Sequence, residues 1–468
     1  VPATPPTAPV AESLRRVGAA LTASAGTVMC GIGMMVFAEF GKFRQAGIAI
    51  TFGLAVVLAA ALTFTPSLLC LAGRWAFWPR RGGAGRGGWV AATSPLARWL
   101  AGNPVQAAWE RLVRLLLARP GTIWLASVAV LLPFAAWGVL NYTTLSYGLL
   151  SELSPDKTSV KGAAEVQAHF PAGNTGPVTL ILRNEQVDFG SKTGRAAIKA
   201  LTDVLNKHHD SLDIADVRSL THPYGFDGGS GLTGSVIERR LRRRRIRDHY
   251  VCSKEDLDGL LTRIDVVFRD DPFSRDSIKQ LDRLQEHIEY VIQASAGDVL
   301  NGEVIQVSEE QRSDIRGITW PSKGEGALYA IGPTASIRDL KHVTDRDQVR
   351  VDLLVLAGVY AILVILLRRP AISLYLIIGV FFSYLAALGV TFVVFEHIWP
   401  SGDALFGGLD WKVPMFLFTI LIAVGEDYNI FLMTRIEEEQ RRHGLVQGVA
   451  EALLKTGSVI AGCGVIMA

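Results

Sequence analysis

Cysteine is scarce in this chain, and its placement excludes two kinds of site. The sequence has four cysteines in 468 residues, and Cys30, Cys70 and Cys463 lie in apolar segments. Only Cys252 lies in the long polar region in the middle of the chain, so this region cannot contain an internal disulfide. No pair of cysteines has the spacing of a metal-binding motif, and we expect no metal site and no cofactor.

Charged residues are also few, at 19% of the chain against about 25% in ordinary soluble domains. Hydrophobic residues make up 49%, and the mean hydropathy is +0.29. This balance is typical of a membrane protein whose polar residues are concentrated in separate segments. The net charge of +3 is too small to indicate a nucleic-acid partner.

Two common signatures are missing as well. The sequence contains no phosphate-binding G-x-x-x-x-G-K-[ST] loop, which argues against nucleotide hydrolysis, and no Ser/His/Asp pattern of a hydrolase. It begins without Met or a signal peptide, and its final charge-free run, 456–468, is shorter than the roughly 20 residues of a membrane span. We therefore expect the chain to be a fragment of a longer, non-enzymatic protein.

Long charge-free runs predict most of the membrane spans. Each run is apolar on all sides, which distinguishes a span from an amphipathic surface helix. The predicted charge-free spans are residues 17–38, 46–73, 121–140, 353–367 and 370–395. Residues 413–434 form a sixth predicted span, interrupted by two acids, and residues 456–468 begin a seventh. An α-helical membrane bundle is the expected architecture.

The basic residues of the short loops predict the orientation. The segment 74–120 carries eight arginines and one acidic residue, so it is expected on the cytoplasmic side. Alternation then places residues 141–350 on the outer, periplasmic side. The predicted order is two spans in 1–73, a basic cytoplasmic linker in 74–120, one span in 121–140, an extracytoplasmic α/β domain in 141–350, and three spans with the start of a fourth in 351–468.

The polar region reads as a mixed α/β domain inserted between spans. Its pattern predicts strands at 177–183, 214–220, 263–269 and 326–332, with helices at 194–210 and 274–295. Two β-α-β passes fit a ferredoxin-like module. The arginine-rich run "ERRLRRRRIRD" at 238–248 is interpreted first as a solvated helix face, with an anionic partner or lipid headgroups as the functional alternative.

A faint internal repeat relates two apolar segments. "GTVMCGIGMM" at 26–35 aligns with "GSVIAGCGVI" at 457–466 at an offset of 431 residues. Glycines at this spacing let membrane helices approach closely. Large transporters are commonly built from two similar halves, and the repeat predicts that organisation here.

The segment "LIAVGEDYNIFLMTRIEEE" at 421–439 places two acids, Glu426 and Asp427, inside an apolar run. A carboxylate at this depth costs about 2.5–3.5 kcal/mol and must face a protein interior or a water-filled cavity. Burial disfavours the charged form, so such a group can exchange protons near neutral pH, with Tyr428 as a hydrogen-bonding neighbour. The alternative is a structural hydrogen bond without turnover. Periodicity alone leaves open which acid faces inward.

The same segment resembles the signature G-x-D-Y-x-x-F-L-x-x-R-x-x-E-E of the MMPL transporters, which belong to the resistance-nodulation-division (RND) superfamily. The matching residues are Gly425, Asp427, Tyr428, Phe431, Leu432, Arg435, Glu438 and Glu439. "GPTASIRDL" at 332–340 is similar to the family's segment leading out of an outer domain. The resemblance covers nearly the whole chain and is stricter in 330–468 than in 142–325.

The resemblance implies an RND-type bundle of twelve spans with two outer "porter" domains, of which this chain would hold spans five to ten, the start of eleven and the second porter domain. It implies proton-driven export of lipids or other hydrophobic molecules across a bacterial inner membrane. Asp427 and Tyr428 match the family's proton-coupling pair on the tenth span, which favours Asp427 over Glu426 as the inward acid. Gly425, Glu426, Thr27 and Ser458 are expected to support the pair.

Protons are then the expected coupling ion. The expected partners are membrane lipids and a hydrophobic or lipid cargo, with a homo-oligomer left open. Two other functions remain open: a protein-export helper or sterol-handling relative with the same fold, and a non-transporting membrane sensor whose outer domain binds a ligand.

Overall fold

The computed structural model describes residues 7–72, 104–148, 153–154, 156–185, 187–226, 236–295, 328–398 and 409–467. The chain folds into two compact units. The first consists of Val1–Thr144, Val343–Trp399 and Trp411–Ala468, and the second of Leu145–His342 and Pro400–Asp410. We describe each unit separately.

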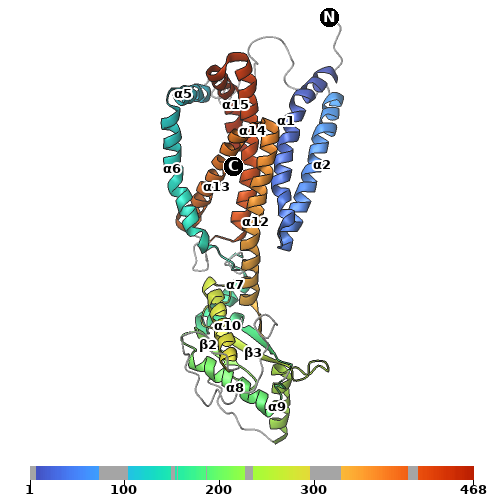
Figure 1. The fold of residues 1–468 in the computed structure, drawn as a ribbon, viewed down its shortest axis with the longest axis vertical. Helices are drawn as coiled ribbons and strands as arrows, with labels where there is room; N and C mark the ends of the chain where they lie inside the picture. Colours follow the sequence, from blue (N-terminus) through green and yellow to red (C-terminus); the bar gives the residue numbers. More distant parts are fainter. Residues whose placement is uncertain are drawn as a thin grey trace. The chain divides into compact units, whose positions relative to one another are not determined.

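The first unit is helical (Figure 1). Pro120 and Pro370 occupy the first turns of α6 and α13, where proline is favoured because the missing N–H would have no helical acceptor. The helices are α1 (Thr7–Gly33), α2 (Gly41–Ala72), α5 (Pro104–Ala118), α6 (Pro120–Leu140), α12 (Pro333–Leu367, which begins in the second unit), α13 (Pro370–Val393), α14 (Lys412–His443) and α15 (Leu445–Met467). Short 3-10 or π turns cover Met34–Phe37, Asn141–Thr144 and Val394–Ile398.

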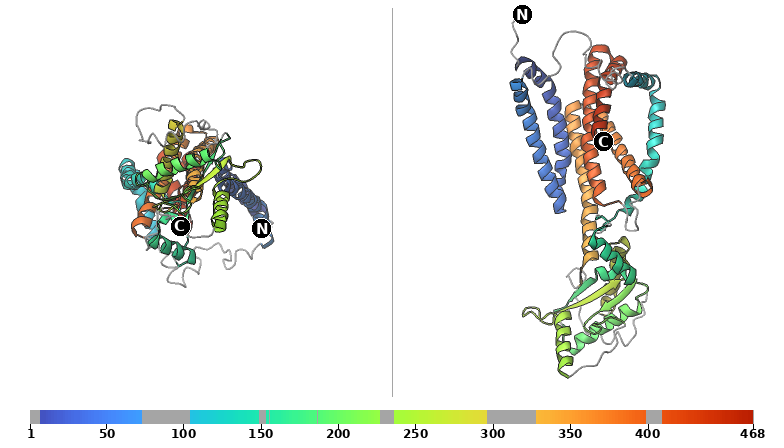
Figure 2. Two further views of the ribbon diagram at one scale, coloured as in Figure 1. Left: turned by 90° about the horizontal axis from the view of Figure 1, so that it is seen from below. Right: turned by 180° about the vertical axis from the view of Figure 1, so that it is seen from behind.

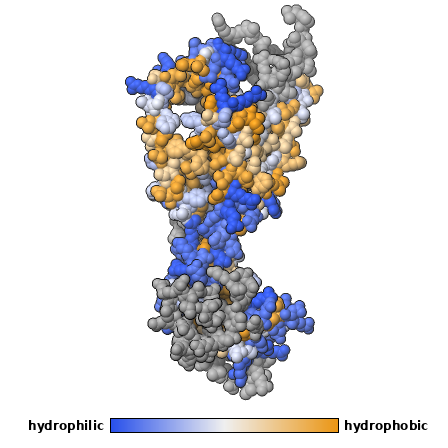
Figure 3. Space-filling model, in the orientation of Figure 1, coloured by the Kyte–Doolittle hydropathy of each residue, from blue (hydrophilic) through white to orange (hydrophobic). Residues whose placement is uncertain are grey.

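Five stretches in the described part of the chain are long and apolar enough to cross a membrane. They are Gly41–Ala72, Pro120–Thr144, Pro333–Leu367, Pro370–His397 and Lys412–His443, which confirms five of the predicted spans. The first predicted span corresponds to a shorter apolar stretch, Leu21–Phe37, and 456–468 lies in α15 apart from its last residue. Hydrophobic residues gather on the surface of this unit (Figure 3). The chain is therefore a multi-pass membrane protein.

Small residues set the closest helix contacts. α1 and α2 lie side by side in every view (Figure 2), and α6 packs along α13. A Cβ atom at Gly138 would lie 2.8 Å from the main-chain oxygen of Leu385, and one at Gly389 would overlap the carbonyl of Phe134. Without a hydrophobic driving force in lipid, such close backbone approach is a main source of helix association.

The second half of the predicted linker is helical. α5 packs against α15, where Trp109 Nε1 donates a hydrogen bond of 2.9 Å to the main-chain oxygen of Leu453, and Val113 is buried. The glycine-rich stretch 80–88 lies outside the described residues.

The second unit is a small α/β domain with a four-stranded antiparallel sheet in the order β2-β3-β1-β4. Leu180 of β1 pairs with Ile264 of β3 and with Ala330 of β4. The elements are α7 (Thr158–His169), a 3-10 turn (Ala172–Thr175), β1 (Val178–Arg183), α8 (Lys192–Lys207), β2 (Ile214–Arg218), α9 (Val236–Tyr250), β3 (Leu261–Phe268), α10 (Arg275–Ser295) and β4 (Leu328–Ile331). All four predicted strands and both predicted helices are confirmed.

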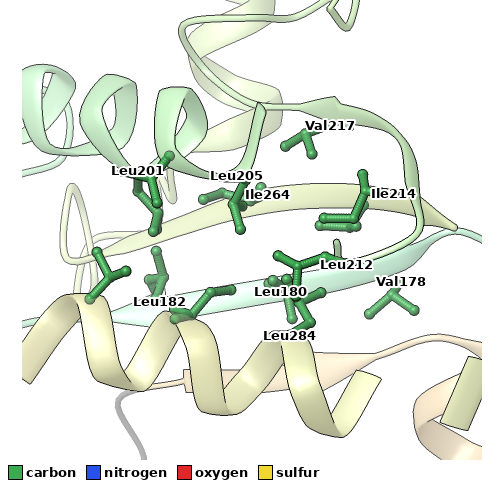
Figure 4. Close-up of a cluster of buried hydrophobic side chains, with 14 of the residues drawn as sticks. Val178, Leu180, Leu182, Leu201, Leu205, Leu212, Ile214, Val217, Ile264 and Leu284 are labelled. Carbon is green, nitrogen blue, oxygen red and sulfur yellow. The ribbon is translucent and has the colours of Figure 1, made fainter. Parts of the chain in front are cut away.

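One face of this sheet is buried under helices (Figure 4). Val178, Leu180 and Leu182 alternate along β1 and are buried, because successive side chains of a strand point to opposite faces. Leu201 of α8 and Leu284 of α10 join the same cluster, so both helices cover the same face. On α9, the described arginines Arg243, Arg244, Arg245 and Arg247 are exposed, as the solvated-helix interpretation predicted.

Candidate functional site

The candidate site lies on α14, which runs unbroken through the acidic segment. Its apolar first half begins at Lys412, and its second half ends in charged residues. At 1.5 Å per residue, Asp427 lies roughly 22 Å from Lys412 and roughly 12 Å from Arg435. The carboxyl is thus placed within the apolar stretch of the span, nearer to the end that carries Arg435.

Asp427 is partly buried and contacts α1. Its Oδ1 accepts a hydrogen bond of 2.9 Å from the hydroxyl of Thr27, which is fully buried. The side chain of Ser24, one turn earlier on α1, is a second polar neighbour of the carboxyl. The two α1 hydroxyls supply the polar partners that a carboxylate needs away from water.

The Thr27 hydroxyl has one proton and acceptors on two sides. Its Oγ1 lies 2.7 Å from the main-chain oxygen of Ser24 and 2.9 Å from Asp427 Oδ1. An ionised Asp427 accepts the hydroxyl proton, whereas a protonated Asp427 can donate to Oγ1 while the hydroxyl turns to the Ser24 carbonyl. The contact accommodates both protonation states of the carboxyl without movement of heavier atoms.

Glu426 is the more deeply buried of the two acids, with no exposed surface. It shares a helix face with Ile422 and Ile430, which are buried too. Its Oε2 accepts a weak hydrogen bond of 3.4 Å from Asn429, and its buried Oε1 has no hydrogen-bond partner among the residues that the structure describes. The two acids therefore lie on neighbouring faces of α14, Glu426 fully buried and Asp427 partly buried.

The remaining predicted site residues have different surroundings. Tyr428 is half-buried directly after Asp427. Gly425 allows α13 to approach, because a Cβ atom there would lie 3.0 Å from Cγ1 of Val380. Ser458 lies in α15, and its side chain is outside the described part of the structure.

Close packing holds α1 against α14 beside the Thr27–Asp427 contact. A Cβ atom at Gly31, one turn after Thr27, would lie 3.3 Å from the Cβ of Ala423. Ala423 is one turn before Asp427, so the two close contacts lie on the same pair of helix faces. A larger residue at either position would separate the hydroxyl from the carboxyl.

Ion pairs fix the other end of α14. Glu439 is fully buried, and its Oε1 lies 2.8 Å from Arg435 Nη2 and 3.2 Å from Lys455 Nζ of α15. Its Oε2 lies 3.2 Å from Nδ1 of His443. Three basic groups around one buried carboxylate tie α14 to α15 at the end of the span that the basic loops predict to be cytoplasmic.

Comparison with known proteins decides the family. The MMPL family model matches residues 5–123 and 152–468. The chain belongs to the MMPL family. The MMPL chain is 27% identical over 463 residues to the membrane protein ActII-3 of Streptomyces coelicolor, an alignment that covers 98% of this chain and 50% of that protein.

Two further MMPL relatives carry names that state a cargo. The apo-petrobactin exporter of Bacillus anthracis is 24% identical over 466 residues, covering 97% of this chain and 51% of the relative. The sulfolipid-1 exporter MmpL8 of Mycobacterium tuberculosis is 37% identical over 144 residues, covering 31% of this chain and 13% of the relative. This MMPL chain spans about half the length of the relatives that it matches from end to end.

Sequence reasoning missed several residues around the MMPL signature. Ser24 lies one turn before Thr27, and this spacing on one helix face could have indicated it. The pairing of Glu439 with Lys455 crosses from one helix to the next and left no local signal. The alignment of Thr27 with Ser458 in the repeat drew attention to Thr27, and the structure places it against Asp427.

Proposed function

We propose that this chain forms part of a proton-driven exporter of lipids or other hydrophobic molecules in a bacterial inner membrane. Asp427 and Tyr428 would form one half of its proton-coupling site, supported by Thr27, Gly425, Glu426 and Ser458. The observation that carries the proposal is the hydrogen bond between Thr27 and Asp427 inside the helical unit.

This contact meets the physical requirements of proton coupling. The carboxyl is partly buried, and its hydroxyl partner accepts or donates according to the protonation state of Asp427. A proton that crosses the membrane potential releases about 2.3 kcal/mol per 100 mV. Protonation at this depth can therefore draw on the membrane potential as well as on the pH difference.

The relatives support export as the task. Two MMPL proteins that resemble this chain are named as exporters, one of apo-petrobactin and one of sulfolipid-1. These names favour an exporter over a sensor and a lipid or hydrophobic compound as the cargo. We propose no individual cargo, and a homo-oligomer remains a prediction.

The α/β unit supports the assignment of an outer porter domain. Its chain order β1-α8-β2-β3-α10-β4, interrupted by α9, and its sheet order β2-β3-β1-β4 agree with the ferredoxin-like arrangement that the sequence predicts. Its placement on the periplasmic side follows from the basic loops and is part of the proposal.

The test replaces Asp427 in the intact transporter, reconstituted in vesicles with an imposed pH gradient. Asp427→Asn keeps the size of the side chain and removes its titration, so proton influx and efflux of a hydrophobic fluorescent dye should fall by about 10²-fold or more. Asp427→Glu, which still titrates, should retain part of the activity. Expression and thermal melting of both variants serve as the control for folding.

Unchanged proton-driven efflux in Asp427→Asn would sink the proposal. Loss of dye efflux with unchanged proton influx would instead show that Asp427 serves the cargo path. A sensor would retain its response to an outer ligand in this variant.

A further inference from the structure

Two acids on α12 in the helical unit have opposite surroundings. Asp347 is buried, and both of its carboxylate oxygens are hydrogen-bonded. Its Oδ1 accepts a hydrogen bond of 2.8 Å from the main-chain N–H of Glu39, and its Oδ2 accepts one of 2.7 Å from the main-chain N–H of Phe40. Both N–H groups belong to the turn between α1 and α2. This carboxylate has a structural task, because it supplies acceptors for two turn N–H groups that would otherwise lack a partner.

Asp352, five residues further along α12, has a hydrogen-bond partner for only one of its two carboxylate oxygens. Its Oδ2 accepts a hydrogen bond of 2.7 Å from Nε2 of Gln348. Its Oδ1 is buried and has no hydrogen-bond partner in the described part of the chain. No basic side chain of the described residues forms an ion pair with it. A buried carboxylate oxygen without a partner is costly unless it binds a proton or another cation.

The length of the apolar run places Asp352 inside the membrane. Residues 353–367 contain no charge, and at 1.5 Å per residue they span roughly 22 Å. The hydrocarbon core is about 30 Å thick. The core must therefore extend past residue 353, so that Asp352 lies within its outer part.

The recorded neighbours of Asp352 are neutral at ordinary pH: Gln348 on α12 itself and Tyr384 of α13. Tyr384 of α13 interacts electrostatically with Asp352 and with Tyr142, which follows α6. The hydroxyl of Tyr384 donates a hydrogen bond of 3.4 Å to the main-chain oxygen of Pro414 in the first turn of α14. Asp352 thus has an amide and a phenol as neighbours, and the phenol is itself held by the carbonyl of Pro414.

We propose that Asp352 is a second proton-binding carboxyl, which takes up protons from the outer side and delivers them toward Asp427. The inference rests on the proposed function. A proton from outer water binds Oδ1 and neutralises the carboxylate, while the Gln348 amide donates to Oδ2 in both states. Release of that proton to water on the inner side of Asp352 restores the carboxylate, so no other reactant is needed.

The position of Asp352 along the membrane suits this task. A Cβ atom at Gly31 would meet both Ala423 of α14 and Val355 of α12, so these two residues lie at a similar depth. Asp352 lies three residues before Val355 and Asp427 four residues after Ala423, which separates the two acids by roughly 10 Å at 1.5 Å per residue. Asp352 therefore lies nearer to the outer side than Asp427 does. Protons that enter from outside reach Asp352 first.

The first test needs no variant. Dicyclohexylcarbodiimide reacts with protonated carboxyl groups in apolar surroundings, and mass spectrometry locates the modified residue. In the intact wild-type transporter we expect modification of Asp352 that decreases as the pH rises, and none of Asp347, whose oxygens are both occupied. Absence of the label on Asp352 at every pH would overturn the inference, as would protection of Asp352 by sodium ions at constant pH.

The second test separates this inference from the proposed function. In vesicles, Asp352→Asn should shift the outer pH that gives half-maximal dye efflux about one unit lower, a tenfold change in proton concentration. Asp352→Glu should restore the wild-type profile, and Asp347→Asn, the matched acid on α12, should leave the profile unshifted.

The two proposals fail in different ways. An unshifted profile in Asp352→Asn, together with lost efflux in Asp427→Asn, would refute the outer carboxyl and leave the coupling site standing. Normal efflux in Asp427→Asn would refute the proposed function itself.

Discussion

At the residue scale, one carboxyl and one hydroxyl carry most of the argument. Asp427 and Thr27 are 400 residues apart in the sequence and form a 2.9 Å hydrogen bond. The acid among apolar residues was visible in the sequence because a charge in a span is rare and usually functional. That Glu426 is the more buried acid, and that Ser24 is a second hydroxyl neighbour, required the packed helices.

Thr27→Val tests the hydroxyl itself. Valine has nearly the same shape as threonine but cannot hydrogen-bond, and a hydrogen bond to a charged group contributes roughly 1.5–3 kcal/mol. We expect proton-driven efflux in vesicles to fall about tenfold or more. Thr27→Ser keeps the hydroxyl and should retain most of the activity. Equal loss in both variants would show that the packing of Thr27 matters and its hydroxyl does not.

At the scale of elements, apolar runs and the spacing of apolar residues in the sequence were sufficient to predict most helices and strands. The predicted strand at 177–183 is β1, because alternating apolar residues bury one face of the sheet. The amphipathic α5 was not separated from the basic linker, because its arginines were interpreted as a topology signal only. Contacts between helices could not be predicted from these patterns, because they depend on which small residues of one helix pack against which residues of another.

Gly389→Ala tests the contact between α13 and α6. The added methyl group would overlap the carbonyl of Phe134, so the two helices must move apart. We expect a loss of roughly 1–3 kcal/mol or more in the free energy of unfolding, measured by unfolding in mixed detergent. Gly379→Ala is the matched control on the same helix, because a Cβ atom there meets no atom within 4 Å. Equal stability of the two variants would contradict the contact.

At the scale of the whole molecule, the surfaces of the two units suit different surroundings. The helical unit exposes apolar side chains, as Phe52 of α2 does with 72% of its surface accessible, which fits contact with lipid. The α/β unit buries its apolar residues between sheet and helices, as a water-soluble domain does. We therefore expect the stability of each unit to depend differently on pH and on detergent.

The α/β unit should lose stability as the pH falls. Burial, and then the neighbouring His208 at a ring distance of 5.1 Å, lower the pKa of His287 on α10. The unfolded chain then binds the proton more tightly, so stability is full above the ordinary value of about 6.5 and declines as the pH falls through the folded pKa.

Hydrogen exchange in the intact protein can measure this loss. Between about pH 7.5 and about pH 5.5, which bracket the ordinary imidazole value, protection of Arg275–Ser295 should decrease after correction for intrinsic rates. His287→Gln should remove most of that dependence. His249→Gln, a change at an exposed histidine on α9, should not alter it. Identical pH dependence in His287→Gln and the wild type would refute the assignment.

The sequence by itself determined the membrane spans, the strands of the α/β unit and the acidic segment of α14. These features depend on the local order of apolar and polar residues, because this order determines which side chains must be buried in protein or in lipid. Tertiary structure alone decided which side chains meet. Asp347 and Asp352 are both acids on α12. Asp347 accepts hydrogen bonds from two N–H groups of a distant turn, whereas Oδ1 of Asp352 has no hydrogen-bond partner among the described residues. The difference arises because hydrogen-bond partners come from segments that only packing brings together.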